Sequence, residues 1–148
     1  MPQVSGRTLG GQVKVAALLP EAQADLLNRR PAWAALSELF LDTSFDSGDR
    51  DRIASILASS SYSLADLEHI LLWEVYPACR QNLLWIAGEW LAFDPEWLQS
   101  RILRGPSRIV RLWTATLGRV SVHSSLEWRG IKRRVAVRRG KDPRATVP

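Results

Sequence analysis

The chain has 148 residues, of which 46% are hydrophobic and 24% are charged. This size and composition predict a single globular domain that is long enough to bury a real core. The single cysteine, Cys79, excludes an internal disulfide, and no apolar stretch approaches the length of a membrane span. We therefore expect a cytoplasmic protein that does not contact a membrane.

Charge is unevenly distributed along the chain. Residues 1–100 hold seven Lys/Arg and thirteen Asp/Glu, whereas residues 101–148 hold thirteen Lys/Arg and two Asp/Glu. The net charges are therefore −6 and +11, and the pI of about 10.1 comes from the C-terminal part. Such asymmetry bears on the partners of a protein rather than on its fold. It predicts an acidic body followed by a basic extension.

The first 19 residues are expected to form a flexible N-terminal segment. Three glycines fall among residues 1–11, and residues 12–19 fit a short strand as well as a first helical turn. From Pro20 onward, helical start signals and apolar spacings of three and four residues recur. The predicted helices cover about residues 20–28, 31–41, 47–59, 63–75, 77–90 and 94–104.

Local start signals support these boundaries. Pro20 and Pro31 suit the first position of a helix, where the missing N–H is no loss. Ser63 with Asp66 three residues on resembles a capping box, with Asp replacing the preferred Glu. Pro77 is expected to break the helix before it and to open another.

These helices are joined by short connections, so we expect an all-α fold, either a compact helical bundle or an irregular helical array. The helical domain is placed at residues 20–104, followed by a basic extension over residues 105–148. Residues 107–113 fit a further helix. Partial alternation of valines over residues 119–138 is typical of a short β-hairpin, and disorder is the competing interpretation.

Polar residues interrupt the strongly apolar stretch 74–94, and we single them out as a buried network or a partner-binding patch. Glu74 falls near the apolar stripe of its helix, where a carboxylate must be paired or protonated. Arg80 is the expected partner of Glu74 or Glu89. A pair of carboxylates for acid–base chemistry, Glu74 and Glu89, is the alternative. The full set is Glu74, Arg80, Asn82, Glu89, Trp90 and Asp94.

The basic extension supplies a second candidate surface. Residues 129–144 hold eight Lys/Arg and one acid, a density that attracts phosphate backbones without sequence specificity. Trp128 is a candidate for stacking on unpaired bases. A solvated end, an extension folded back on the acidic body, and binding to an acidic protein are the competing interpretations. The proposed polyanion-binding residues are Trp128, Arg129, Lys132, Arg133, Arg134, Arg138, Arg139 and Lys141.

Catalytic and metal chemistry have little support in the sequence. Two histidines and one cysteine are fewer than the four ligands of a closed zinc site, and an acidic cluster over residues 42–51 lacks the spacing of a calcium loop. Cys79, near a helix start, is read either as a reactive thiol facing His69 or as a small core residue. We therefore predict no metal, no cofactor and no enzymatic activity.

Several sequence blocks together resemble a family of small uncharacterised bacterial proteins, over residues 30–104. The blocks are RRPAWAALSELFLDT, RIASILASSSYSLADLEHIL, EVYPACRQNLLWIAGEW and FDPEWLQSRIL. The resemblance implies a helical domain of unknown function and a bacterial source. It carries over neither catalytic residues nor a cofactor, and it does not reach the basic extension.

The function predicted from these observations is binding to another protein without catalysis. Small size, seven tryptophans and charge suited to fast docking favour it. One concrete form is a protein of the immunity or antitoxin type, which neutralises a toxin or enzyme. The alternative is a nucleic-acid-associated protein that uses the basic extension, and the sequence leaves the oligomeric state open.

Overall fold

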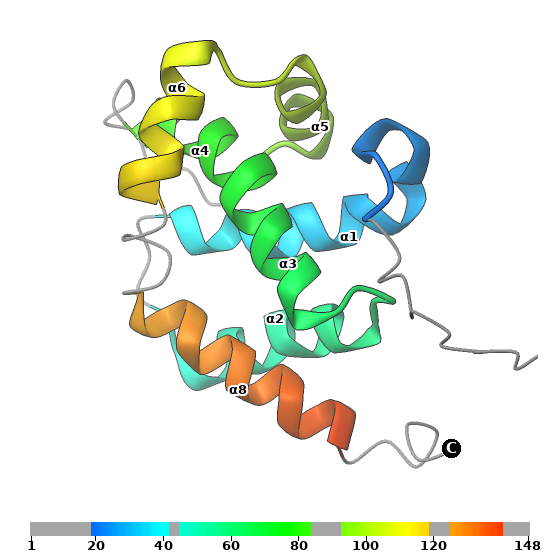
Figure 1. The fold of residues 1–148 in the computed structure, drawn as a ribbon. Coiled ribbons are helices and arrows are strands. Elements are labelled where there is room, and N and C mark those ends of the chain that lie inside the picture. The colour runs from blue at the N-terminus through cyan, green and yellow to red at the C-terminus, as the bar shows by residue number, and fades with distance from the viewer. Residues whose placement is uncertain (1–18, 42–44, 84–92, 119–124, 141–148) are drawn as a thin grey trace, which may run out of the picture.

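The computed structural model describes residues 19–41, 45–83, 93–118 and 125–140. Within these ranges every regular element is helical, which confirms the predicted all-α class (Figure 1). The α-helices are α1 (Leu26–Ser37), α2 (Ser47–Ser59), α3 (Leu64–Ile70), α4 (Tyr76–Leu83), α5 (Pro95–Arg104), α6 (Arg108–Trp113) and α8 (Leu126–Gly140). Shorter 3₁₀ turns are η1 (Ala22–Asp25) and η2 (Glu38–Phe40), and π turns are η3 (Leu71–Val75) and η4 (Thr114–Gly118).

The helix starts follow from local capping chemistry. The Ser63 side chain accepts the Asp66 N–H while Asp66 accepts the Ser63 N–H, so the predicted capping box begins α3. Asp46 begins α2 with a capping box of the same kind. Asp94 accepts the Trp97 N–H at 2.7 Å and begins α5, as its place before a proline predicts.

The first two predicted helices are joined into one, which corrects the expected break at Pro31. Helix α1 begins at Leu26 and runs through Pro31 to Ser37. A proline at this sixth position costs the helix about one hydrogen bond, to the carbonyl of the fourth residue before it. The complete burial of Trp33 and Leu36 just beyond it compensates for that loss.

Pro77 does not break its helix either. Helix α3, the π turn η3 and helix α4 follow one another without a gap, and the Tyr76 N–H bonds to the Leu71 carbonyl, five residues back. A proline ring in a regular α-helix collides with the carbonyl four residues earlier, and a wider π turn relieves that collision. One long, bulged helical segment therefore crosses the middle of the molecule (Figure 1).

The core lies where this long segment meets α1 and α2. It is built from apolar side chains at helical spacing, and the partly buried Phe40 and the buried Tyr76 pack edge to face at its border. Fully buried members include Trp33, Leu36, Ile53, Leu57, Leu67, Ile70, Leu71, Val75 and Leu98.

The basic extension is helical and part of the core, which corrects the expected β-hairpin or disordered tail. Helix α8 packs along α2 and buries Trp128, Ile131 and Val135 completely. Their spacing of three and four residues is that of one helical face. The alternating valines predicted a strand, but Val135 points inward and Val137 is half exposed on the same helix. The helical core thus extends well past residue 104.

Helices α6 and α8 lie at opposite ends of the molecule, with α3 and α4 running between them (Figure 1). Both belong to the C-terminal part of the chain that carries most of the positive charge. The structure thus divides the basic extension into two separate surfaces.

In the described ranges, no helix is both long enough and apolar enough to span a bilayer.

Candidate functional site

Glu74 lies inside the helical assembly, on the buried side that its spacing predicts. Its Oε2 accepts the indole N–H of Trp33 at 2.7 Å and lies 3.2 Å from Arg29 Nε. Arg29 is 1% exposed and the Glu74 side chain is 15% exposed. A buried charge needs a partner, and each of these two residues supplies one to the other. The ion pair of Glu74 is therefore made with Arg29, not with Arg80 as expected.

Arg29 is surrounded by further partners. Its Nη2 donates to the Pro20 carbonyl at 2.7 Å, and its Nη1 lies 3.8 Å from Asp25 Oδ2. The guanidinium carbon stands 5.0 Å from the centre of the Tyr62 ring, a cation–π distance. These contacts tie the start of the described chain, α1 and the start of α3 to one buried cation.

The Tyr62 hydroxyl completes this cluster by donating a hydrogen bond to Asp25 Oδ2. That hydrogen bond lowers the pKa of Asp25, against the opposing effect of burial. Burial, together with the same hydrogen bond, raises the pKa of Tyr62 to about 12. The pair therefore holds a neutral phenol against a carboxylate at neutral pH, which suits a fixed structural contact better than proton transfer.

The other members of the predicted polar set are not brought into this cluster. The Arg80 guanidinium lies 5.8 Å from the centre of the Tyr76 ring. Asp94 is the cap of α5. Asn82 belongs to α4, and Glu89 and Trp90 lie outside the described residues, so the proposed carboxylate pair stays a prediction. Glu74 lines a small surface notch together with residues of α4 and α5.

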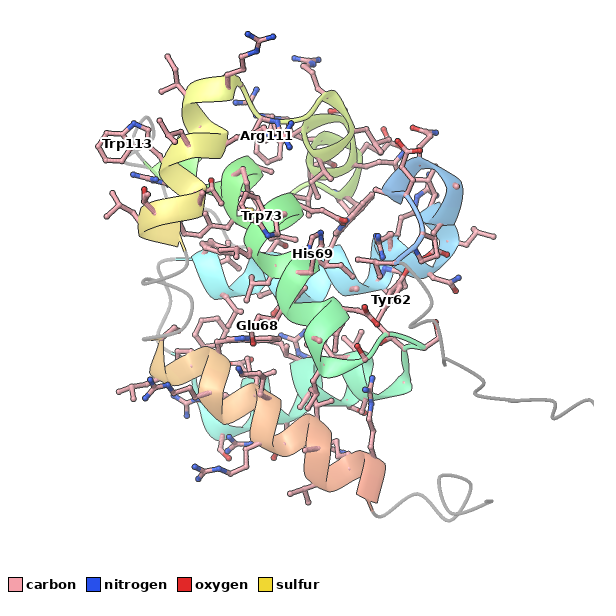
Figure 2. All side chains as sticks on the ribbon, in the orientation of Figure 1. Tyr62, Glu68, His69, Trp73, Arg111 and Trp113 are labelled. Carbon is pink, nitrogen blue, oxygen red and sulfur yellow. The ribbon has the colours of Figure 1, made fainter. Side chains whose placement is uncertain are left out.

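Cys79 is a core residue. Its side chain is fully buried, and burial raises the pKa of its thiol to about 12. A thiol is a poor nucleophile when its pKa is so high. His69 is exposed and lies 6.4 Å, centre to centre, from the Trp73 ring, beside it on the central helical segment (Figure 2). No group of metal-binding side chains occurs among the described residues.

The cations of α8 are largely engaged in contacts with the acidic body. Lys132 Nζ lies 2.6 Å from Glu68 Oε2, and Arg134 Nε lies 3.0 Å from Asp51 Oδ1. The Asp51 carboxylate also faces Arg138 at 3.7 Å. In the reverse direction, α2 reaches α8 through Arg50, which forms two hydrogen bonds with Glu127, at 2.6 and 2.8 Å.

Arg139 closes the C-terminal end of α2. Its guanidinium donates to the carbonyls of Leu57, at 3.0 Å, and Tyr62, at 2.7 Å, and makes longer contacts to those of Ala58 and Ser60. The last carbonyls of a helix lack partners within it and carry partial negative charge, so a cation there is favoured. The structure thus matches the interpretation in which the extension folds back on the body.

The predicted polyanion surface is therefore reduced. Trp128 is 1% exposed and is not available for stacking on a base. Arg129 and Arg133 lie on the exposed side of α8, and Lys141 lies outside the described residues. Four of the eight cations that suggested phosphate binding, Lys132, Arg134, Arg138 and Arg139, contact the body instead.

A surface that the sequence interpretation missed lies on α6 and η4, at the other end of the molecule. Four large apolar side chains point to solvent there, and Figure 2 shows Trp113 projecting outward from α6. They are Ile109 at 71% exposed, Leu112 at 68%, Trp113 at 49% and Leu117 at 44%. Below, these four residues are called the α6 apolar face.

The opposite side of η4 is restricted to small residues by close packing. Thr114 and Gly118 are fully buried. A Cβ atom at Gly118 would meet Tyr76 Cε1 at 3.2 Å and Leu72 Cδ1 at 3.3 Å. The large side chains consequently have no room to turn inward. Contiguous apolar side chains on a protein surface typically mark a binding site.

Arginines lie near the α6 apolar face in sequence, but Arg111 is on the side of α6 towards α5, away from Trp113 (Figure 2). Residues 97–118 contain four arginines and no carboxylate. Arg104, Arg108 and Arg111 are exposed, and no described residue forms an ion pair with any of the three. This contrasts with α8, whose cations are mostly paired. The spacing of residues 109, 112, 113 and 117 was the available signal, but it does not tell an inward face from an outward one.

Comparison with known proteins places the chain in a sequence family. The family model described as Domain of unknown function (DUF7079) matches residues 27–136. The match contains the stretch 30–104 and continues through most of α8. No curated protein matches the chain, and no solved structure matches it.

Proposed function

The chain belongs to the family described as Domain of unknown function (DUF7079), and we propose that it is a small, non-catalytic binding module for another protein. In this proposal it acts in the cytoplasm of a bacterium. The observation that carries the proposal is the exposed α6 apolar face, near arginines that pair with no described residue. Exposed aromatic and aliphatic anchors next to arginine are the composition that protein interfaces favour.

The ionisable side chains of the core are held in fixed contacts, and this supports a binding role. Glu74 is held by Trp33 and Arg29, and Asp25 is held by Tyr62. Side chains fixed in this way stabilise the scaffold, and a rigid scaffold presents its surface residues with little loss of entropy on binding. The α6 apolar face is attached to this scaffold through the tight contact at Gly118.

A toxin-neutralising role of the immunity or antitoxin type is the concrete form of this proposal. Such a protein binds one enzyme tightly and blocks it, so it needs one well-defined docking surface and no chemistry of its own. A purified partner enzyme should then lose activity on addition of about one equivalent of this protein. Full partner activity in the bound complex would contradict the neutralising form but not the binding function.

The test is capture of a partner from a lysate of the source cells, followed by reconstitution from purified components. The variant I109S/L112S/L117S should lose the partner, because it removes aliphatic anchors. The matched control is Leu27→Ser, which changes an apolar residue that is 85% exposed in α1. The control should bind as the unchanged protein does.

Nuclease treatment of the lysate separates this proposal from the nucleic-acid alternative. A partner that is retained after treatment, and lost in the triple variant, supports protein binding. If nothing but nucleic acid is retained, or if the triple variant binds normally, the proposed function is wrong. The nucleic-acid alternative is the weaker one, because four of the α8 cations on which it relied contact the body.

A further inference from the structure

We propose that the partner docks through an acidic amphipathic segment, which lies along α6 and η4 with its apolar side on the α6 apolar face. This inference rests on the proposed function and adds the chemistry of the partner to it. Two features of the surface define that chemistry. One is the length and composition of the α6 apolar face, and the other is the set of exposed arginines on α5 and α6.

The α6 apolar face has the dimensions of a contact between two helices. Residues 109 to 117 span about 12 Å along a helix axis, which is slightly more than two turns. Apolar residues separated by three and four positions form a continuous row on the surface. An amphipathic helix recognises such a row with three or four anchors of the same spacing. The expected partner segment is therefore about two to three turns long.

The arginines of α5 and α6 specify the sign of the charge expected on the partner. Arg104, Arg108 and Arg111 are exposed, and the described residues give them no carboxylate to pair with. Arginine binds a carboxylate through two parallel hydrogen bonds. Aspartate and glutamate at the edge of a partner helix can pair with Arg108, which lies about one turn before Leu112. The positive charge of all three arginines would also raise the association rate.

A second copy of the chain does not supply that complement. Two α6 apolar faces placed against each other would bring two positively charged segments together, since residues 97–118 contain four arginines and no Asp or Glu. Like charges in contact across an interface are unfavourable. Nucleic acid is also a poor match, because three of the four residues of the α6 apolar face are aliphatic and offer no ring for stacking on bases.

Site-specific photo-crosslinking tests this inference. A photoreactive amino acid replaces Leu112, in the middle of the α6 apolar face, and irradiation is carried out in the source cells. A matched protein carries it at Leu126, which is 79% exposed and begins α8 at the other end of the molecule. Mass spectrometry then identifies the peptide or other molecule attached at each position.

The expected product at position 112 is a protein segment in which Asp and Glu outnumber Lys and Arg and apolar residues recur every three or four positions. It should be absent at position 126. Crosslinking at position 112 to nucleic acid, to lipid, to a second copy of this chain or to a segment without excess acid would overturn the inference. So would a partner that crosslinks at position 126 alone.

Salt dependence supplies an independent readout with the purified partner. The variant R104Q/R108Q/R111Q should bind at least tenfold more weakly at low salt, and this difference should shrink towards high salt because surface charges are screened. A partner whose affinity is equal for both proteins at every salt concentration contradicts the acidic segment while leaving the proposed function intact. If no protein partner crosslinks or is captured at all, both proposals fail together.

Discussion

Arg29 and Glu74 face each other inside the core, with 3.2 Å between Arg29 Nε and Glu74 Oε2. The contact joins α1 to the π turn η3, and the indole N–H of Trp33 binds the same carboxylate oxygen. A buried ion pair adds little net stability compared with an apolar pair of the same shape, but removal of one partner leaves the other charge buried and uncompensated. The pair is therefore a point at which single substitutions should be severe.

Glu74→Gln should destabilise the protein by about 2–4 kcal/mol, because it leaves Arg29 without its closest countercharge. The amide oxygen can still accept the Trp33 N–H, so the effect reports mainly the loss of charge. Urea denaturation followed by circular dichroism measures the change. Glu38→Gln is the matched control, since the Glu38–Arg52 pair is exposed, and it should cost less than about 1 kcal/mol. Equal losses for the two variants would contradict a buried role for Glu74.

Tyr62 predicts a loss of stability at high pH. Its pKa is raised from 10.0 to about 12 in the folded protein, so the folded state prefers the protonated phenol more than the unfolded state does. This contribution is complete below pH 10 and is lost as the pH rises towards 12. Tyr62→Phe should remove that part of the alkaline slope.

The measurement for Tyr62 is the free energy of unfolding at a series of pH values between 9 and 12, together with the ultraviolet absorbance of tyrosinate. In Tyr62→Phe the phenol that titrates near pH 12 should disappear. Identical pH profiles for the variant and the unchanged protein would contradict the Tyr62–Asp25 contact.

In the acid range, the lowered pKa of Asp25 stabilises the fold at pH values above the ordinary pKa of 3.8, and this contribution is lost as the pH falls below it.

Trp128→Ala should destabilise the whole protein by about 3–5 kcal/mol, because it leaves a large cavity between α8 and α2. Leu126→Ala changes an exposed residue two positions earlier in the same helix and should lie within about 0.5 kcal/mol of the unchanged protein. Chemical denaturation of both variants makes the comparison. A Trp128→Ala protein as stable as the Leu126→Ala control would show that α8 is dispensable.

Cys79 should resist thiol reagents until the protein unfolds. It is fully buried and its thiol pKa is raised to about 12, so both access and the thiolate fraction are small. The rate of reaction with a disulfide reagent at pH 8 should follow the unfolding rate, and it should increase with urea. Immediate labelling in native buffer would place the thiol on the surface and would contradict the burial of α4.

Several elements could be predicted from local sequence because their causes are local. The capping residues Ser63 and Asp94 act within three positions of themselves. The apolar row from Trp33 to Leu36 also follows from helical spacing alone. Helix boundaries at Pro31 and Pro77 were wrong, since the missing hydrogen bond of a proline is small beside the burial of its neighbours.

The candidate site was harder to predict because pairing is decided across the fold. Arg80 is the arginine nearest to Glu74 in sequence, but the packing of α1 against the central helix brings Arg29 to it. Likewise, the sequence does not show that the α8 cations are engaged, because Asp51 and the Leu57 carbonyl of α2 and the Tyr62 carbonyl before α3 come beside them only in the fold.

The amino-acid sequence by itself determined the helical class, the caps and the uneven charge, because periodicity, capping and composition are properties of neighbouring residues. Only the tertiary structure decided which of the basic residues remain unpaired and which apolar row faces solvent. The spacing of Ile109, Leu112 and Trp113 is equally compatible with an inner face. The close approach of η4 to α4 at Gly118 leaves no room for that row inside, so it is exposed beside Arg108.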